Sequence, residues 1–191
     1  MSIAVAIPSI PTRPDLLARA VRSAANQTMP PVEISVVLDV DRHGAATTRN
    51  RAWRATSAEW VAFLDDDDEL LPMHLARCYE TAVAHDADFV YPWFEVIGGQ
   101  DPFPHHFGAP WEPGGPRQTT VTGLWRRSAL ERIGGFPPPV GDDDPDGNRM
   151  GEDFLAVCKL DAAGGRIVHL PERTWLWHHH ASNTSGCPDR W

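Results

Sequence analysis

The sequence predicts an α/β fold, in which a mostly parallel sheet is flanked by crossover helices within a single domain. In the N-terminal half, short apolar runs of strand length alternate with amphipathic stretches of helix length. Clusters of Pro, Gly or Asp follow these runs, where strands would end. The 191 residues, 42% hydrophobic and 23% charged, suit one soluble globular domain with a real core.

The first three strands are expected at 3–7, 34–38 and 60–64. Thr12 can cap a helix after the first strand, and Pro14 suits the first turn of that helix. Gly44 precedes a second helix over about 45–56. A strand, helix, strand, helix, strand order at this spacing is typical of a parallel sheet with crossover connections.

The C-terminal part is less regular. A helix from Pro72 to about His85 precedes a strand over 88–93, and the Pro- and Gly-rich stretch 98–117 is expected to be irregular, as a mobile flap or as part of an acceptor site. A short helix over 128–133 ends at Gly134–Gly135. After a Pro- and Asp-rich loop, a helix from Gly151 to about 163 precedes two strands, at 166–170 and 174–180.

Four consecutive aspartates, Asp65 to Asp68, directly follow the predicted strand 60–64. Two unit charges about 4 Å apart repel by roughly 4 kcal/mol at an effective dielectric near 20. Such a cluster is tolerable in open solvent, as a solvated acidic loop, or around a cation. Ligands of open parallel sheets bind beyond the carboxyl ends of the strands, where this cluster lies, so a cation site is the preferred interpretation.

Two further loops, 8–13 and 39–41, are expected at the same edge of the sheet as the four aspartates. The carboxyl ends of parallel strands meet at one edge, so the three loops together predict a pocket there.

Composition narrows the classes of partner. The net charge of −9 argues against general binding to nucleic acid or anionic membrane, because neutralising phosphates requires clustered Lys and Arg. The N-terminus lacks a basic region and Pro8 interrupts its apolar run, so no secretory signal is predicted, and no apolar window of about 18 residues predicts a membrane span. Three cysteines without a C-x-x-C pair favour reduced thiols and a cytoplasmic location.

Five stretches in order carry a resemblance to a known family. They are A-I-P-S-I-P-T-R-P at the N-terminus, T-T-R-N before the third strand, F-L-D-D-D-D-E-L-L-P, the pair R-R-S-A-L-E-R-I-G-G-F with M-G-E-D-F, and H-H-H-A-S-N-T-S. Over nearly its whole length the chain resembles a small family-2 glycosyltransferase of the GT-A fold, a Rossmann-like architecture. The resemblance implies a nucleotide-sugar-binding half at about 1–95 and an acceptor-binding half at about 96–191.

The resemblance implies that Asp65 and Asp67 hold Mn²⁺ or Mg²⁺ beneath the diphosphate of a nucleotide-sugar, with Asp67 as the direct ligand. Such hard cations are commonly held by one or two carboxylates together with substrate phosphates. The chain has a histidine tract at 178–180. Within it, His180 best matches a family contact to the diphosphate or metal, and His178 is the second choice. A purely structural role for this tract is the alternative.

The resemblance also implies a binding site for the nucleotide. Asp39 would accept a hydrogen bond from the base, although Leu38-Asp39-Val40-Asp41 replaces the usual acidic pair followed by Gly-Ser, which leaves the base open. Alternatively, Asp39 is an ordinary loop aspartate without a ligand contact. The alternative for Arg49 and Asn50 is that they are simply exposed residues of a helix. The residues expected around the nucleotide are Pro8, Ser9, Thr12, Arg13, Asp39, Arg49, Asn50, Asp65 and Asp66.

On the acceptor side, Glu152 and Asp153 resemble the paired acids of the family, with Asp153 as the general base. It would take the proton from an acceptor hydroxyl while that oxygen attacks the anomeric carbon, in a single displacement with inversion. Alternatively, both acids only complement the helix dipole, which is worth under about 1 kcal/mol. The tryptophans at 93, 111, 125, 175 and 177 could include a platform for stacking a sugar, although most tryptophans simply pack.

These expectations amount to a metal-dependent glycosyltransferase that moves a sugar from a nucleoside-diphosphate-sugar, most readily a UDP-sugar, to a hydroxyl acceptor. A nucleotidyltransferase would share the sheet but needs a glycine-rich phosphate loop, and Pro8 to Pro14 contains no glycine. A non-catalytic nucleotide-sugar or carbohydrate-binding module is the third hypothesis. The sugar, the acceptor, including a modified nucleic acid, and the oligomeric state, including a homodimer, are left open.

Overall fold

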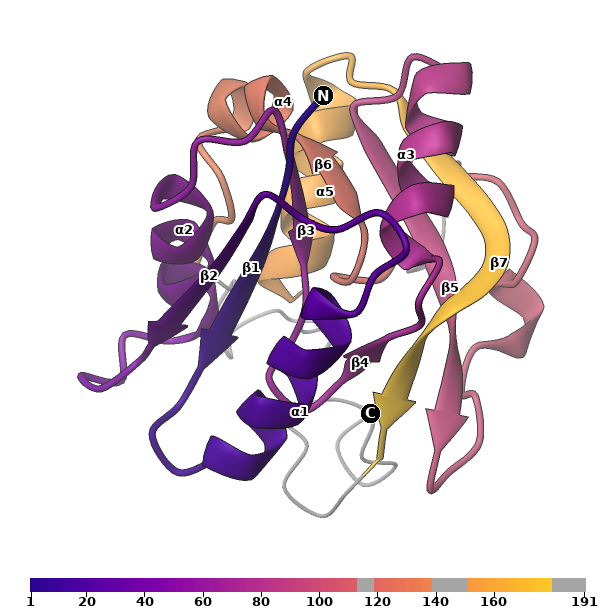
Figure 1. Ribbon diagram of the computed structural model, residues 1–191. Helices are drawn as coiled ribbons and strands as arrows, with labels where there is room; N and C mark the ends of the chain where they lie inside the picture. Colours follow the sequence, from indigo (N-terminus) through magenta and orange to yellow (C-terminus); the bar gives the residue numbers. More distant parts are fainter. Residues whose placement is uncertain (113–118, 139–150, 180–191) are drawn as a thin grey trace, which may run out of the picture.

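A computed structural model describes residues 1–112, 119–138 and 151–179 (Figure 1). Its centre is one seven-stranded sheet with the order β2-β1-β3-β6-β5-β7-β4. The strands are β1 (Ile3–Ser9), β2 (Glu33–Leu38), β3 (Trp60–Phe63), β4 (Glu69–Leu70), β5 (Phe89–Ile97), β6 (Leu124–Arg126) and β7 (Ile167–His178). The predicted α/β architecture is confirmed.

Helices cover both faces of the sheet and bury two apolar layers. On the face nearer the viewer in Figure 1, α1 and α3 pack over Val5 and Val90. On the other face, α2, α4 and α5 pack over Phe63 and Phe89. The helices are α1 (Pro14–Ala25), α2 (Ala45–Arg54), α3 (His74–Ala84), α4 (Arg127–Ile133) and α5 (Glu152–Ala162), and a 3-10 turn covers Pro104–His106.

The N-terminal half follows the predicted parallel pattern. β1 pairs in parallel with β2 on one side and with β3 on the other, and β1, Ile3 to Ser9, is buried along its whole length. A strand covered on both faces is expected to be continuously apolar, which is why these segments could be recognised. The cap of α1 was predicted wrongly: Arg13, not Thr12, occupies the N-cap position, without a side-chain cap.

The C-terminal half is mixed rather than parallel. β6 lies between β3 and β5 and pairs antiparallel with both, whereas β5 and β7 run parallel. The two predicted final strands are one strand, β7, which contains Pro171 and shifts register against β5 near Trp93. β4 and β6 were missed, because two or three residues are too few to show a periodicity.

The topology brings the three predicted loops to one edge of the sheet. Ser9 at the end of β1 is level with Leu38 at the end of β2, and the Asp39 amide donates to the Ser9 carbonyl at 2.8 Å. On the other side of β1, the Leu64 amide donates to the Ala6 carbonyl at 3.2 Å. The acidic residues after β3 therefore begin beside the loop that follows β1. Within the described ranges, no helix is long and apolar enough to cross a membrane.

Candidate active site

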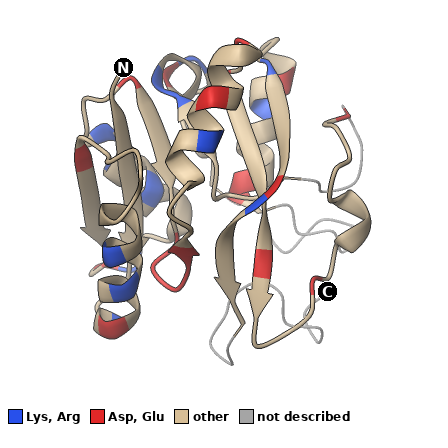
Figure 2. Cartoon of the chain, turned by 45° about the vertical axis from the view of Figure 1, so that its right-hand side comes forward, with Lys and Arg blue, Asp and Glu red and all other residues tan. Residues whose placement is uncertain are grey.

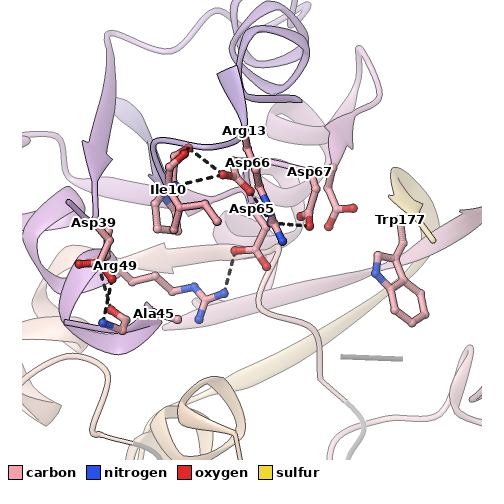
Figure 3. Close-up of a pocket in the computed structure, with 14 residues that line it drawn as sticks. Ile10, Arg13, Asp39, Ala45, Arg49, Asp65, Asp66, Asp67 and Trp177 are labelled. Atoms are coloured by element: carbon pink, nitrogen blue, oxygen red, sulfur yellow. Dashed lines mark hydrogen bonds and ion pairs between the residues drawn. The ribbon is translucent and has the colours of Figure 1, made fainter. Parts of the chain in front are cut away.

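A cavity of about 260 Å³ opens at this edge, between the β1–α1 loop, the N-terminus of α2 and the acidic loop after β3 (Figure 3). Most of the residues expected around the nucleotide line it, whereas Thr12 and Asn50 are not among the lining residues. The residues that line the cavity are Pro8, Ser9, Ile10, Arg13, Asp39, Gly44, Ala45, Thr48, Arg49, Asp65, Asp66, Asp67, Asp68 and Trp177.

Three of the four consecutive aspartates converge on one point, and the fourth, Asp66, bonds elsewhere. Carboxylate oxygens of Asp65, Asp67 and Asp68 all lie within 4.8 Å of one another, and we call these three residues the acid trio. Asp66 is turned toward the β1–α1 loop, where its Oδ2 accepts from the Ser9 hydroxyl at 2.7 Å. Figure 2 shows the acidic loop in red at the end of the central strands. Sequence reasoning placed Asp65 and Asp67 in the cation site but did not include Asp68.

Burial and mutual repulsion make Asp67 and Asp68 costly to ionise. Asp67 and Asp68 are both buried, and burial raises the pKa of each carboxyl group, with the charge of Asp65 raising it further. The effect is larger for Asp68, whose pKa lies well above its ordinary value of 3.8. Three converging carboxylates are the ligand set that a hard divalent cation prefers, so these residues fit Mn²⁺ or Mg²⁺.

Arg19 of α1 also supports the acidic loop, and sequence reasoning missed it. Its guanidinium donates to the Asp67 carbonyl and lies 3.4 Å from a Glu69 carboxylate oxygen. The packing of α1 against β4 determines what this side chain reaches, and no local pattern in the sequence encodes that packing.

Arg49 joins the acid trio to helix α5. One guanidinium nitrogen donates to Asp65 Oδ1 at 2.7 Å, and the other nitrogen forms an ion pair with Glu152. The Arg49 side chain is only 8% exposed, and its Nε is buried without a hydrogen-bond partner in the described part of the chain. The charges of Asp65 and Glu152 outweigh the effect of burial and raise the pKa of Arg49, which stays charged. Arg49 is therefore buried and paired with the acidic cluster, and it is not simply an exposed helix residue.

Asp153 lies next to this ion pair in the first turn of α5. The residue is partly buried, and its Oδ1 accepts from the Phe154 amide at 2.8 Å. Burial, followed by the charge of Glu152, raises the pKa of Asp153, although Arg49 opposes the shift. A Cβ atom on Gly151 would lie 2.5 Å from Asp153 Oδ1. The glycine of M-G-E-D therefore leaves the space in which the Asp153 carboxylate lies.

Asp39 shapes the loop after β2. Its two carboxylate oxygens accept from the His43 and Gly44 amides, both at 2.8 Å. Burial alone would raise the pKa of Asp39, but these two hydrogen bonds outweigh burial and lower it. Asp39 thus stays ionised and holds the entrance to α2, and the contact of Asp39 with a base stays a prediction.

Asn50 contacts the segment after α4. Its side chain bonds both the amide and the carbonyl of Phe136, at 2.9 and 2.7 Å, and accepts from Trp53 Nε1 at 3.0 Å. Gly135 has a φ of +81°, and a Cβ there would lie 2.2 Å from Asn50 Oδ1. The I-G-G-F stretch therefore brings α4 against α2, and a nucleotide contact for Asn50 stays a prediction.

The histidine tract lies only partly within the described residues. The His178 amide donates to Asp68 Oδ1 at 3.0 Å, and His178 Nε2 lies 2.7 Å from Glu69 Oε1. His178 is not a member of the acid trio. His180, the first choice of histidine ligand, lies outside the described residues.

Most of the tryptophans considered as a sugar platform are buried. Trp93, Trp125 and Trp175 are at most 4% exposed, so they pack in the two apolar layers and cannot stack on a sugar. Trp111 is partly exposed and packs near Phe154 of α5. Among the tryptophans of the described ranges, Trp177 lines the cavity beside the acid trio (Figure 3), where it is placed to contact a ligand.

Repulsion in the acid trio leads to a stability prediction. Asp68→Asn removes one buried charge but keeps the oxygen that accepts from the His178 amide. In metal-free buffer the variant is expected to be more stable by about 1 kcal/mol, a rise in melting temperature of roughly 2–4 °C. Saturating Mn²⁺ is expected to abolish this advantage, because a bound cation offsets the repulsion. Thermal unfolding with EDTA and with Mn²⁺ measures both effects. Exposed Asp41→Asn is the matched control, and a metal-free Asp68→Asn protein that melts no higher than wild type would contradict the prediction.

The chain is similar to known proteins in its sequence and in its fold. The model for glycosyl transferase family 2 matches residues 36–136. Succinoglycan biosynthesis protein ExoW of Rhizobium meliloti (strain 1021) is 29% identical in a match that covers 56% of the chain and 41% of ExoW. The crystal structure of S. aureus TarS 1-349 in complex with UDP-GlcNAc matches with a TM-score of 0.73 at 17% identity, over 98% of the chain and 62% of TarS 1-349.

The complex of TarS 1-349 with UDP gives a TM-score of 0.70 at 18% identity, over 94% of the chain and 61% of TarS 1-349. The chain thus spans less than two thirds of the length of these relatives. The structural likeness shows a shared fold, that of the GT-A glycosyltransferases.

Proposed function

The chain belongs to glycosyl transferase family 2, and we propose that it transfers a sugar from a UDP-sugar to a hydroxyl acceptor. We further propose that the reaction requires Mn²⁺ or Mg²⁺ and inverts the anomeric centre, with Asp153 as the general base. The observation that carries the proposal is the convergence on one sheet edge of the acid trio, Arg49 and the first turn of α5.

The donor side is supported by the cavity at the ends of β1 and β2. Ser9, Arg13 and Arg49 line this cavity, and guanidinium groups are suited to binding phosphate oxygens. The fold match to TarS bound to UDP-GlcNAc and to UDP supports a uridine nucleotide as the donor.

The acid trio would hold the cation, and in such a site a divalent cation stabilises the negative charge that develops on a departing diphosphate. Within the trio, Asp67 converges with the other two carboxylates and also accepts a hydrogen bond from Arg13 of the β1–α1 loop. We therefore expect Asp67 to contribute most to cation binding, as the resemblance implied.

On the acceptor side, Glu152 and Asp153 have different tasks. The ion pair between Glu152 and Arg49 fixes the first turn of α5 to the acid trio through Asp65. Asp153 has no such ion pair in the described residues, and its raised pKa makes it a stronger base than an ordinary aspartate. Asp153 would thus accept the acceptor proton, while Glu152 positions the helix.

A panel of nucleotides tests the donor and the cation together. With Mn²⁺ present, UDP and UDP-GlcNAc at about 100 times their dissociation constants are expected to raise the melting temperature by roughly 5–10 °C. The same ligands with EDTA, or ADP and GDP with Mn²⁺, should give much smaller shifts. If UDP gives no shift at any Mn²⁺ concentration, the proposed donor is wrong.

The reaction products separate the remaining hypotheses. A glycosyltransferase releases UDP from UDP-GlcNAc, by slow hydrolysis or by transfer, whereas a nucleotidyltransferase releases pyrophosphate when it forms a nucleotide-sugar. Binding without either product across a broad set of acceptors would favour a non-catalytic module.

A further inference from the structure

Arg13 bonds the acid trio from outside. Its Nη1 donates to Asp67 Oδ2 at 2.8 Å and to Asp66 Oδ1 at 2.9 Å, so one guanidinium joins two neighbouring carboxylates. The Arg13 side chain is 18% exposed, and that of Asp67 is 12% exposed. A positive charge of the protein thus lies against the carboxylate that is expected to contribute most to cation binding.

Asp66 keeps Arg13 in this place. Asp66 Oδ2 accepts from the Ser9 hydroxyl at 2.7 Å and from the Ile10 amide at 3.3 Å, which leaves Oδ1 for Arg13. The first loop therefore anchors Asp66, and Asp66 in turn holds the guanidinium beside Asp67.

A divalent cation bound by the acid trio would compete with Arg13 for Asp67. Two positive charges against one carboxylate repel each other, and the repulsion is much stronger in a partly buried site than in water. A diphosphate relieves this conflict, because it adds negative charge and its oxygens accept hydrogen bonds from a guanidinium. Arg13 lines the same cavity as the acid trio, so phosphate oxygens there lie within reach of its side chain.

We propose that Arg13 is a displaceable counter-ion of the acid trio. Without donor, Arg13 occupies Asp67 and weakens the binding of a divalent cation. When a nucleoside diphosphate enters, Arg13 moves from Asp67 to phosphate oxygens, and the cation takes its place. This inference rests on the proposed function, since it requires a cation and a diphosphate at the same site. Because coupling between two ligands is reciprocal, the cation must raise the affinity for UDP by the same factor as UDP raises the affinity for the cation.

Arg13→Gln tests the proposal directly by Mn²⁺ titration, with free Mn²⁺ measured by electron paramagnetic resonance. Without nucleotide, the variant is expected to bind Mn²⁺ at least about tenfold more tightly than wild type, because the competing charge is gone. The increase in Mn²⁺ affinity that UDP causes should then be smaller in the variant by a similar factor.

Two further variants control for folding and for net charge. Arg13→Lys keeps the charge beside Asp67, so its affinity for Mn²⁺ alone should stay within about threefold of wild type. Arg22→Gln removes the same charge from an exposed position in the last turn of α1 and should leave the Mn²⁺ affinity within about twofold.

The inference is overturned if Arg13→Gln binds Mn²⁺ no more tightly than wild type, or if Arg22→Gln gains as much as Arg13→Gln. If wild type binds Mn²⁺ with UDP and Arg13→Gln behaves identically, this inference fails and the proposed function stands. If wild type binds no Mn²⁺ even with UDP, the proposed metal dependence fails and the inference fails with it.

Discussion

Asp67→Ala is expected to reduce sugar transfer by at least about 100-fold and to remove the effect of Mn²⁺ on UDP binding. Asp67 is the trio member that also bonds Arg13, so its loss weakens the cation site and leaves the guanidinium bonded to Asp66. Transfer rates at saturating Mn²⁺, together with UDP titrations with and without Mn²⁺, measure the two effects separately.

The control for this prediction is Asp15→Ala, which removes an exposed acid from the first turn of α1. This variant should transfer sugar at close to the wild-type rate. Melting temperatures of both variants show whether the fold survives, and Asp67→Ala is expected to melt no lower than wild type in EDTA, because repulsion within the acid trio decreases. Full transfer activity in a folded Asp67→Ala protein would end the metal-dependent mechanism.

The fold could be predicted where burial leaves a continuous pattern. β1 and β3 are covered on both faces, so their sequences are uninterrupted apolar runs that stop at Pro or Asp. β6 has three residues, and its antiparallel position between β3 and β5 depends on pairing with segments that are distant in sequence. No local signal encodes such pairing, which is why the mixed half of the sheet was predicted less well than the parallel half.

In the candidate site, the sequence indicated which residue types carry the chemistry but not which of them contact one another. The run Asp65–Asp68 indicated a cation site, because repulsion demands compensation, but the sequence could not show that Asp66 turns away while Asp68 joins the acid trio. That division depends on hydrogen bonds from Ser9 and Ile10 in a distant loop. The ion pair of Arg49 with Glu152 spans 103 positions, and no spacing rule predicts it. The resemblance named both residues, and the structure shows that they form an ion pair.

Asp153→Asn is expected to leave Mn²⁺-dependent UDP binding within about twofold of wild type and to reduce transfer by roughly 10²- to 10⁴-fold, the usual contribution of a general base. Asn keeps the size of the side chain and the oxygen that accepts from the Phe154 amide, so α5 should stay in place. Glu152→Gln is the contrasting variant. Since Glu152 pairs with Arg49, its loss should disturb donor binding as well as transfer.

Gly151→Ala keeps the Asp153 carboxylate but should displace it, so this variant tests whether the position of the carboxylate matters. The added Cβ would lie 2.5 Å from Asp153 Oδ1, so the carboxylate must rotate away, while Gly151 itself has a φ of −62° that alanine adopts readily. This variant should fold normally and bind UDP, yet lose much of its transfer activity. Wild-type transfer in both Asp153→Asn and Gly151→Ala would remove Asp153 from the role of base.

The pH dependence of transfer tests the same assignment independently. A general base acts as the carboxylate, so the rate falls as pH drops through the pKa of Asp153. Because burial raises that pKa above its ordinary value of 3.8, the fall is expected at a higher pH than for an exposed aspartate. The residual rate of Asp153→Asn should lack this acid limb, since its side chain does not ionise. If the variant kept the limb at the same pH, the titrating group would be another residue, and the proton of the acceptor would have to leave by another route.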